Sequence, residues 1–339
     1  MGVFNDQTSG SEAERARQVF LAMLKARQLE MKLSSLYKAG KIVGGVYLGK
    51  GQEAVSASLG SALIPGRDIF APLIRDQAGR TAFGEDVMDC TRTYLGSQLG
   101  PMRGRDGNIH RGRPKDGIFA MISHLGAQVP MVTGALLARR LKGDLDGTVG
   151  ATSVGDGATS TGAFHEGLNA AAVEKLPLVV VVANNQFAYS TPNDRQFACE
   201  DLLDRAKGYG VGGHSVDGTD FLDCVRGIGK AVNAARSGQG PQMVVARLLR
   251  LSGHGEHDDG SYVPDTLRAG HVGRDCMDIA VEQLIEEGYA TADEIVAWRE
   301  EVTDEVQRAL AKAQQEPVPD PWHEKWEALS SNLSTTSEA

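Results

Sequence analysis

The spacing of apolar side chains divides the chain into alternating helices and strands. From Glu12 to Lys38 apolar residues recur with a period near 3.6, which predicts a long helix that ends before Gly40. Further helices are predicted from Gly51 to about Leu63 and over residues 131–141, 164–175, 221–236, 274–287 and 292–315. Strands are predicted at residues 69–73, 149–154, 178–183, 213–216 and 243–251. This alternation predicts an α/β fold, with a mostly parallel sheet covered by helices on both faces.

The continuous run of valines within 178–183 is typical of a strand that is buried on both faces of its sheet. Two long irregular stretches, 99–119 and 252–265, interrupt the regular elements, and such stretches in a compact domain are often functional. We divide the chain into four parts: a polar segment at 1–15, a main ligand-binding domain at 16–270, a pair of helices at 271–318 and a polar tail at 319–339. We expect the tail to be disordered.

Composition narrows the class of protein. The chain has 339 residues, of which 41% are hydrophobic, and this length is ample for a large core. Its net charge of −9, without a basic stretch, argues against nucleic acid as the main partner. The four cysteines form no C-x-x-C pair, which fits a reducing cytosol and no zinc site. The polar residues 5–17 show no signal peptide, and no apolar run reaches the ~18 residues of a membrane helix. We therefore expect a cytoplasmic protein without a membrane partner.

The stretch from Ser153 to Asn185 carries the strongest chemical signal. It reads as a strand, the turn Gly155-Asp156-Gly157, a helix, a second strand and then Asn184-Asn185. Parallel strands end at the same edge of their sheet, so Asp156 and Asn185 should converge although they are 29 residues apart (185 − 156). A carboxylate and an amide oxygen form a natural ligand pair for Mg²⁺.

The glycines of this turn suit a phosphate group. Gly155 and Gly157 allow backbone N–H groups to approach an anion, and the next helix adds the favourable partial charge of its N-terminus. The unit therefore predicts a cradle for a magnesium-bound diphosphate. It is neither a Walker loop nor a G-x-G-x-x-G turn. A glycine-rich tight turn without a ligand is the alternative, and the offset to Asn185 favours the cradle.

GDG, followed about thirty residues later by NN, resembles the thiamine diphosphate motif. The run GDGATSTGAFHEGLNAAAVEKLPLVVVVANNQFAYSTP is similar to the alpha subunits of the 2-oxo acid dehydrogenase family, which includes pyruvate, branched-chain and acetoin dehydrogenases. The similarity extends over roughly 20–315 and includes, in the family's order, GQEA, GNIH at 107–110, LGAQVP at 125–130, VDG at 216–218 and RLSGHGEHDD at 250–259. The resemblance implies a thiamine-diphosphate-binding fold.

The resemblance also implies roles for the cradle. Asp156, Asn185 and the backbone carbonyl of Phe187 would bind Mg²⁺, while Gly155, Gly157 and Ala158 would surround the diphosphate with backbone groups. Arg75 and Arg250 match residues that contact the cofactor phosphates, and a guanidinium pairs well with phosphate oxygens. The alternative for Arg75 is a salt bridge with Asp76 or Glu85.

The other matched residues concern the organic part of the cofactor and the reaction. Ser123 and Leu125 match positions whose backbone groups hold the aminopyrimidine ring. His254 matches the active-site histidine, which can move protons near neutral pH. The alternative for His254 is a loop histidine beside two acidic residues. His110, in the GNIH motif, is expected to be structural.

Three positions depart from the family pattern. Ile74 stands where a tyrosine is usual, so one hydrogen bond to the cofactor is missing. Gly255 replaces the serine or threonine that is phosphorylated in mitochondrial members, which predicts that this control is absent. Tyr47 replaces a second histidine of some pyruvate and acetoin enzymes. Ser123 is the residue found in branched-chain relatives, where pyruvate-type relatives have glycine, and it slightly favours the branched-chain type.

By resemblance, the chain is the alpha subunit of a decarboxylating 2-oxo acid dehydrogenase that uses thiamine diphosphate and Mg²⁺. A beta subunit would supply the glutamate that activates the cofactor, in an assembly of two alpha and two beta chains. The acyl group would pass to the lipoyl group of an acyltransferase partner. A split transketolase-like subunit and a non-catalytic paralogue are the alternatives, and the particular 2-oxo acid is left open.

Overall fold

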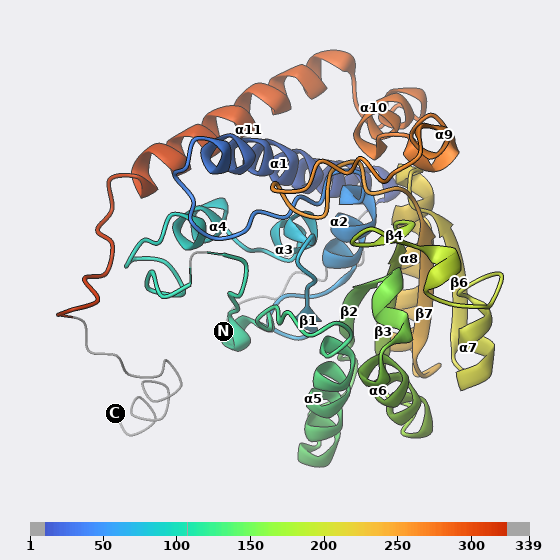
Figure 1. Cartoon of the computed structure of the whole chain (residues 1–339). Helices are drawn as coiled ribbons and strands as arrows, with labels where there is room; N and C mark the ends of the chain where they lie inside the picture. The colour runs from blue at the N-terminus through green and yellow to red at the C-terminus, as the bar shows by residue number, and fades with distance from the viewer. Residues whose placement is uncertain (1–10, 107, 324–339) are drawn as a thin grey trace.

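Five parallel strands form the central sheet of the computed structural model, which describes residues 11–106 and 108–323. Their order across the sheet is β1 (Ile69–Ala71), β2 (Gly150–Gly155), β3 (Leu178–Asn184), β7 (Gln242–Arg247) and β6 (Gly212–Asp217) (Figure 1). Every neighbouring pair is parallel. The prediction of an α/β fold with a mostly parallel sheet is therefore confirmed.

The register of the sheet places the two halves of the GDG–NN motif at one edge. Gly155, the last residue of β2, pairs with Ala183 near the end of β3. Asp156 begins the short 3-10 helix η3 (Asp156–Ser160) directly after β2, and Asn185 follows β3. Both side chains therefore leave the sheet at its carboxyl edge, where ligands bind in open α/β sheets.

Helices cover both faces of the sheet, as predicted. The valines of β3 alternate between two hydrophobic cores, since Val179 and Val181 belong to one and Val180 and Val182 to the other. The first core packs against α2 (Glu53–Ala62) and α8 (Phe221–Arg236). The second packs against α5 (Gln128–Lys142) and α6 (Gly162–Val173), which lie side by side (Figure 1).

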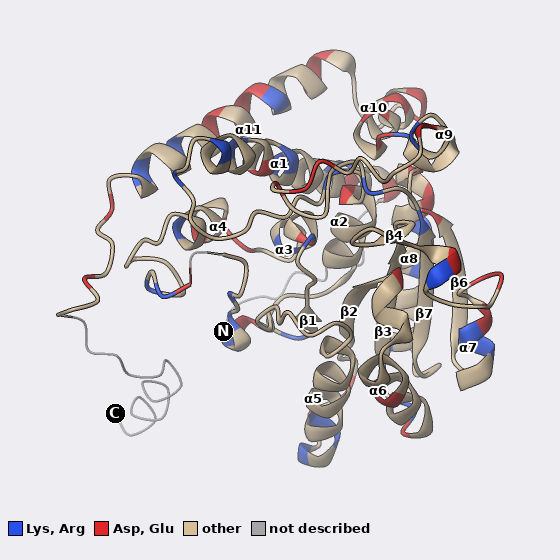
Figure 2. Ribbon diagram, in the orientation of Figure 1, with Lys and Arg blue, Asp and Glu red and all other residues tan. Residues whose placement is uncertain are grey.

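The helix predicted from Glu12 to Lys38 is α1 (Glu12–Lys38), with both ends as expected. It begins because the Ser11 side chain accepts a hydrogen bond from the Glu14 N–H. Its neighbour α11 (Ala292–Ala313) is amphipathic, with both signs of charge along the ribbon (Figure 2). Val302, Val306 and Leu310 of α11 recur every four residues and are buried in the first core.

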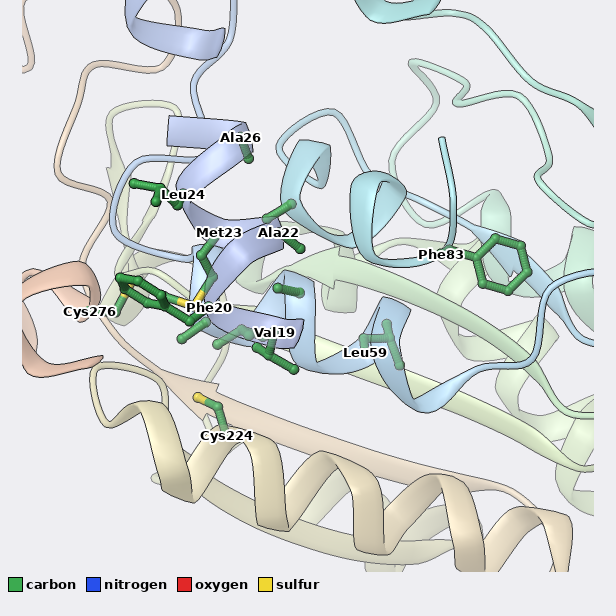
Figure 3. Packing of buried hydrophobic residues seen from close by; sticks show 14 of the residues in the cluster. Val19, Phe20, Ala22, Met23, Leu24, Ala26, Leu59, Phe83, Cys224 and Cys276 are labelled. Carbon is green, nitrogen blue, oxygen red and sulfur yellow. The ribbon is translucent and has the colours of Figure 1, made fainter. Parts of the chain in front are cut away.

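The first core joins distant parts of the chain. Figure 3 shows Phe20 and Met23 of α1 close to Cys276 of α10 (Cys276–Glu286), with Val19 of α1 on the side of Leu59 of α2. The Phe20 ring also contacts Trp298 of α11, with 6.1 Å between ring centroids. The helices of region 271–318 thus complete the core that α1 and α2 begin. The boundary at residue 270 remains a prediction.

Several short elements were not predicted. They are the helices α3 (Gln77–Ala82), α4 (Val87–Tyr94), α7 (Asp204–Tyr209) and α9 (Asp265–Arg268), the 3-10 turns η2 (Pro114–Asp116), η4 (Asn193–Arg195) and η5 (His271–Gly273), and the hairpin of β4 (Phe187–Ala188) with β5 (Thr191–Pro192). Such pieces are too short to show a period. The strand predicted over 243–251 ends earlier, at Arg247, because Leu249 turns away and donates its N–H to Val272.

Some predictions fall outside the described residues. The outer parts of the two polar end segments, 1–10 and 324–339, are among them, and so is Gly107 of the GNIH motif. Within residues 11–106 and 108–323, no helix has the length and apolar character needed to cross a membrane.

Candidate functional site

A cavity of about 360 Å³ lies at the carboxyl ends of β2 and β3. Its wall contains every residue that the sequence assigned to the site except Ser123: Arg75, Leu125, Gly155, Asp156, Gly157, Ala158, Asn185, Phe187, Arg250 and His254. Two other cavities, of about 390 and 600 Å³, adjoin Arg247 near β6 and β7 and contain none of these residues. The chemistry predicted from the sequence is therefore gathered in one place.

Two oxygens in this cavity lack hydrogen-bond donors. The Gly157 N–H donates to Oδ1 of Asp156 at 2.7 Å, but within residues 11–106 and 108–323 Oδ2 has no partner, and neither does Oδ1 of Asn185. Both side chains are buried, with 1% and 6% of their surface exposed. Burial raises the pKa of Asp156 to about 6, although the Gly157 N–H and the charge of Arg250 oppose the shift. A cation beside these two hard oxygens would relieve the cost of their burial, so the pair fits Mg²⁺.

The backbone carbonyl of Phe187 is the third predicted metal ligand. It accepts a hydrogen bond from Nη1 of Arg250 at 3.2 Å. A carbonyl oxygen has two lone pairs, so this contact leaves one for a metal. Its role as a ligand remains a prediction.

Two buried arginines face the cavity. Arg75 donates to the carbonyls of Leu48 (3.0 Å) and His254 (2.6 Å), and it is 4% exposed. Arg250 donates to the carbonyls of Phe187 and Tyr189 and is 3% exposed. Burial and the nearby charge of Arg250 lower the pKa of Arg75 to about 9. Two cations this close, both turned to carbonyls, favour an anionic ligand between them.

The alternative of a salt bridge for Arg75 is not observed. Among the described residues, neither Arg75 nor Arg250 forms an ion pair with a carboxylate. Asp76 accepts instead from the Leu73 N–H and the Ser153 hydroxyl. Glu85 is held by two other buried arginines, Arg80 and Arg111.

His254 lies between two tyrosine rings. Its ring centroid is 4.5 Å from that of Tyr189 and 5.5 Å from that of Tyr47, whose ring it meets at its edge. Burial, Arg75 and Arg250 together lower the pKa of His254 to about 4. The imidazole is therefore neutral near pH 7. Its loop is held by Asp258, which accepts from the backbone N–H groups of His254 and Gly260.

Two of the departures from the family pattern are neighbours in space. A Cβ atom at Gly255 would lie 2.8 Å from the His257 ring and 3.1 Å from the Tyr47 ring. The His257 and Tyr47 rings together therefore fill the space that a side chain at position 255 would need. Ile74, the third departure, lies in the cavity wall.

Ser123 lies outside the cavity wall and is exposed. Its hydroxyl is 2.7 Å from Nε2 of His110, whose Nδ1 is 3.0 Å from Asp106. His110 thus holds the loop before α5, in line with the structural role expected for it. Leu125, two residues further on, does reach the cavity and is 58% exposed. The backbone roles assigned to both residues remain predictions.

Another cluster of metal-binding groups is already neutralised. Glu53, Asp275 and Cys276 bring their ligand atoms within 4.8 Å of one another. The Arg27 guanidinium lies against both carboxylates, with Nη1 2.8 Å from Asp275 and Nε 2.5 Å from Glu53. A protein cation therefore occupies the position that a metal would take.

The two glycines of the GDG turn differ in what surrounds them. A Cβ at Gly157 would lie 2.4 Å from the Cβ of Ala188, a distance that real side chains do not reach. Gly155 has the ordinary φ of −80°, and a Cβ there would meet no atom within 4 Å. Gly157 is therefore required by packing, whereas Gly155 keeps open space beside the cavity.

Alanine at these two positions is expected to act in different ways. Gly155→Ala should change the free energy of unfolding by no more than about 0.5 kcal/mol, because its backbone and space suit alanine. Its methyl group should nevertheless enter the cavity and weaken cofactor binding. Gly157→Ala should cost about 1–3 kcal/mol through overpacking. Urea unfolding and titration with thiamine diphosphate and Mg²⁺ would separate the effects. Unchanged binding in Gly155→Ala would contradict the assignment of this cavity.

Sequence reasoning missed several residues near the site. Gln52 accepts from Nδ2 of Asn185 at 3.4 Å, and the Tyr189 ring lies against His254 at an angle of 45°. Gln196 lies near Gly157, with its Oε1 3.4 Å from the position that a Cβ would take there. Gln52 is the second residue of the GQEA motif, so its place in that motif could have drawn attention to it. Nothing in the local sequence distinguishes Gln196.

Comparison with known proteins places the chain among enzyme components. The family model described as "Dehydrogenase E1 component" matches residues 22–322. The alpha subunit of acetoin:2,6-dichlorophenolindophenol oxidoreductase from Cupriavidus necator is 33% identical over 307 residues, which cover 89% of this chain and 90% of that protein. The 2-oxoisovalerate dehydrogenase alpha subunit of Bacillus subtilis is 35% identical, with 77% and 78% covered. The pyruvate dehydrogenase E1 alpha subunit of Rhizobium meliloti is 31% identical, with 93% and 91% covered.

Proposed function

The chain belongs to the dehydrogenase E1 component family, and from this premise we propose that its cavity binds thiamine diphosphate together with Mg²⁺. As a member of this family it is the alpha subunit of a thiamine-diphosphate-dependent 2-oxo acid dehydrogenase. One observation carries the proposal for the cavity. The two donor-free oxygens of Asp156 and Asn185 and the two buried arginines, Arg75 and Arg250, share one wall. This wall combines a cation site with an anion site, as a magnesium diphosphate requires.

The residues of the chain then have separate tasks. Asp156 and Asn185 hold the metal, and Arg75 and Arg250 bind the diphosphate oxygens. Thiamine diphosphate held by these residues would supply the nucleophilic carbon needed for decarboxylation of a 2-oxo acid. We assign proton transfer beside the reacting groups to the imidazole of His254, because a bound anionic diphosphate would offset the charges of Arg75 and Arg250 that lower its pKa. The rings of Tyr47 and Tyr189 contact the imidazole and position it.

A beta subunit belongs to the same proposal. Among the described residues in the cavity wall, Asp156 carries the only carboxylate, and it is assigned to the metal. The acid that activates the cofactor must therefore come from elsewhere. Leu125 and Tyr189 are 58% and 46% exposed at the cavity, where a second chain would cover them. We place the complete active site at that interface, in an assembly of two alpha and two beta chains.

The remaining partners follow from the reaction. The substrate is a small 2-oxo acid, and the acyl group passes to a lipoyl group on an acyltransferase partner. The named relatives act on acetoin, 2-oxoisovalerate and pyruvate, so the match leaves the substrate open among these types. The family match over residues 22–322 favours this function over a transketolase-like subunit. We place the protein in the cytoplasm, because its four cysteines are free thiols.

The decisive experiment uses this chain purified with its beta subunit. Thiamine diphosphate and Mg²⁺ at 100 times their dissociation constant should stabilise the protein by about 2.7 kcal/mol. Reduction of an artificial dye should then accompany decarboxylation of pyruvate or of a branched-chain 2-oxo acid, with acetoin tested alongside. Arg75→Met should lose cofactor binding, whereas Arg308→Met, on the exposed surface of α11, should bind normally. No stabilisation of the unmodified protein by the cofactor would refute the proposal.

A further inference from the structure

Gln196 holds its side-chain amide in a fixed orientation. Its Nε2 donates to the backbone carbonyl of Thr191 at 2.8 Å and lies 3.4 Å from Oδ1 of Asn193. If the amide were turned over, Oε1 would lie 2.8 Å from a carbonyl oxygen with no hydrogen between them. The two acceptors therefore require the nitrogen on their side and leave Oε1 on the other.

The Oε1 atom of Gln196 faces the GDG turn. It is 3.4 Å from the position that a Cβ would take at Gly157. The Ser160 hydroxyl donates to the Gln196 carbonyl at 2.8 Å, which ties this segment to η3, the 3-10 helix that begins with Asp156. Gln196 is therefore anchored to the turn through its backbone as well.

This oxygen is buried and has no hydrogen-bond donor among the described residues. Oδ2 of Asp156 and Oδ1 of Asn185 share that property. A buried acceptor without a partner costs about 1–3 kcal/mol. Asp156 and Asn185 line the cavity and Oε1 of Gln196 lies beside Gly157, so one bound cation with its water ligands would satisfy all three acceptors. Mg²⁺ usually keeps several water ligands, and their O–H groups are strong donors.

We infer that Gln196 accepts a hydrogen bond from a water molecule on the Mg²⁺ that Asp156 and Asn185 hold, and so positions the metal. The inference rests on the proposed function, because it needs the metal to be bound there. Gln196 lies beyond the GDG–NN unit, 11 residues after Asn185 (196 − 185), and its contribution adds an oxygen that the motif does not contain. Partners in this outer position strongly affect metal affinity.

The test measures metal binding directly. The chain is purified with its beta subunit, saturated with thiamine diphosphate and titrated with Mn²⁺, and free Mn²⁺ is followed by electron paramagnetic resonance. Gln196→Met keeps the length of the side chain but removes Oε1, and it should raise the Mn²⁺ dissociation constant about 10-fold or more. Gln196→Glu keeps an acceptor oxygen and should bind Mn²⁺ more tightly than Gln196→Met.

Ser160→Ala is the matched control. It removes the hydroxyl that donates to the Gln196 backbone carbonyl and so loosens the segment, yet it leaves the Gln196 amide and its two acceptors in place, so its Mn²⁺ affinity should equal that of the unmodified protein. Equal affinity of Gln196→Met and the unmodified protein would overturn the inference alone. An equal loss in Ser160→Ala would also overturn it, since Gln196 would then only anchor the segment. Failure of the unmodified protein to bind Mn²⁺ with the cofactor would refute the proposed function itself.

Discussion

Asp156→Asn is expected to abolish binding of Mg²⁺ and thiamine diphosphate and, at the same time, to stabilise the cofactor-free protein at pH 7. Asparagine keeps the oxygen that accepts the Gly157 N–H but removes the negative charge. In the folded protein that charge is buried, and the pKa of Asp156 is about 6 instead of 3.8. This difference corresponds to roughly 3 kcal/mol of destabilisation at pH 7. Asp156 therefore destabilises the folded protein as long as no metal is bound.

The pH dependence gives this prediction a clear sign. The folded-state pKa is raised, so the folded protein binds a proton more readily than the unfolded chain between about pH 4 and pH 6. Below that range Asp156 is protonated in both states and does not destabilise the folded protein. Above it the destabilisation by the buried charge is complete. Urea unfolding of both proteins without cofactor should show the advantage of Asp156→Asn shrinking towards zero as the pH falls to about 4. An advantage that is independent of pH, or an asparagine variant less stable at pH 7, would contradict this account.

Glu85→Gln is expected to destabilise the protein by about 3–5 kcal/mol, because it removes the one negative charge between two buried guanidinium groups. Glu85 accepts from Arg111 through both oxygens, at 2.9 and 2.6 Å, and from Arg80 at 3.2 Å. Arg80 and Arg111 have no exposed surface, and Glu85 is 4% exposed. Without the carboxylate, two cations would face each other away from water.

The charges of the buried triad Arg80, Glu85 and Arg111 also predict how stability depends on pH. Burial alone would raise the pKa of Glu85, but Arg111 and Arg80 more than reverse this and lower it to about 2. The folded-state pKa is depressed, so the stabilisation is present above pH 4.5 and is lost as the pH falls towards 2. Urea unfolding at pH 7 measures the effect. Glu174→Gln is the control, since Glu174 is 43% exposed in its pair with Arg140 and should contribute no more than about 1 kcal/mol. Similar losses in the two variants would refute the special role of the triad.

The sequence predicted the elements whose apolar residues recur with a regular period over many positions. It also predicted contacts between motif residues at a known spacing along the chain. The helix at Glu12–Lys38 and the strand around Val180 have patterns that only one kind of element satisfies. The meeting of Asp156 and Asn185 follows from parallel topology alone, because both follow strands that end at one edge. The cavity that contains both confirms that they meet.

Local sequence patterns could not show the contacts that join distant segments. Arg80, Glu85 and Arg111 look like solvated charges in the sequence, and only the folded chain shows that they neutralise one another inside it. Gln196 is one of several amides in its region, and its orientation depends on two acceptors in the turn before it. The hydroxyl of Ser123 is held by a histidine 13 residues earlier (123 − 110), across an irregular stretch without a period.

The packing of α1 against α11 affects the order in which the protein can fold during its synthesis. Phe20 contacts Trp298, and Lys25 forms an ion pair with Glu305 at 2.9 Å. The first residue of α11 is added 254 residues after α1 is complete (292 − 38). At about 5–20 residues per second, the ribosome needs roughly 13–50 seconds to make that stretch. During this time the apolar side of α1 that belongs to α11 stays uncovered, so the nascent chain must be protected from aggregation until α11 emerges.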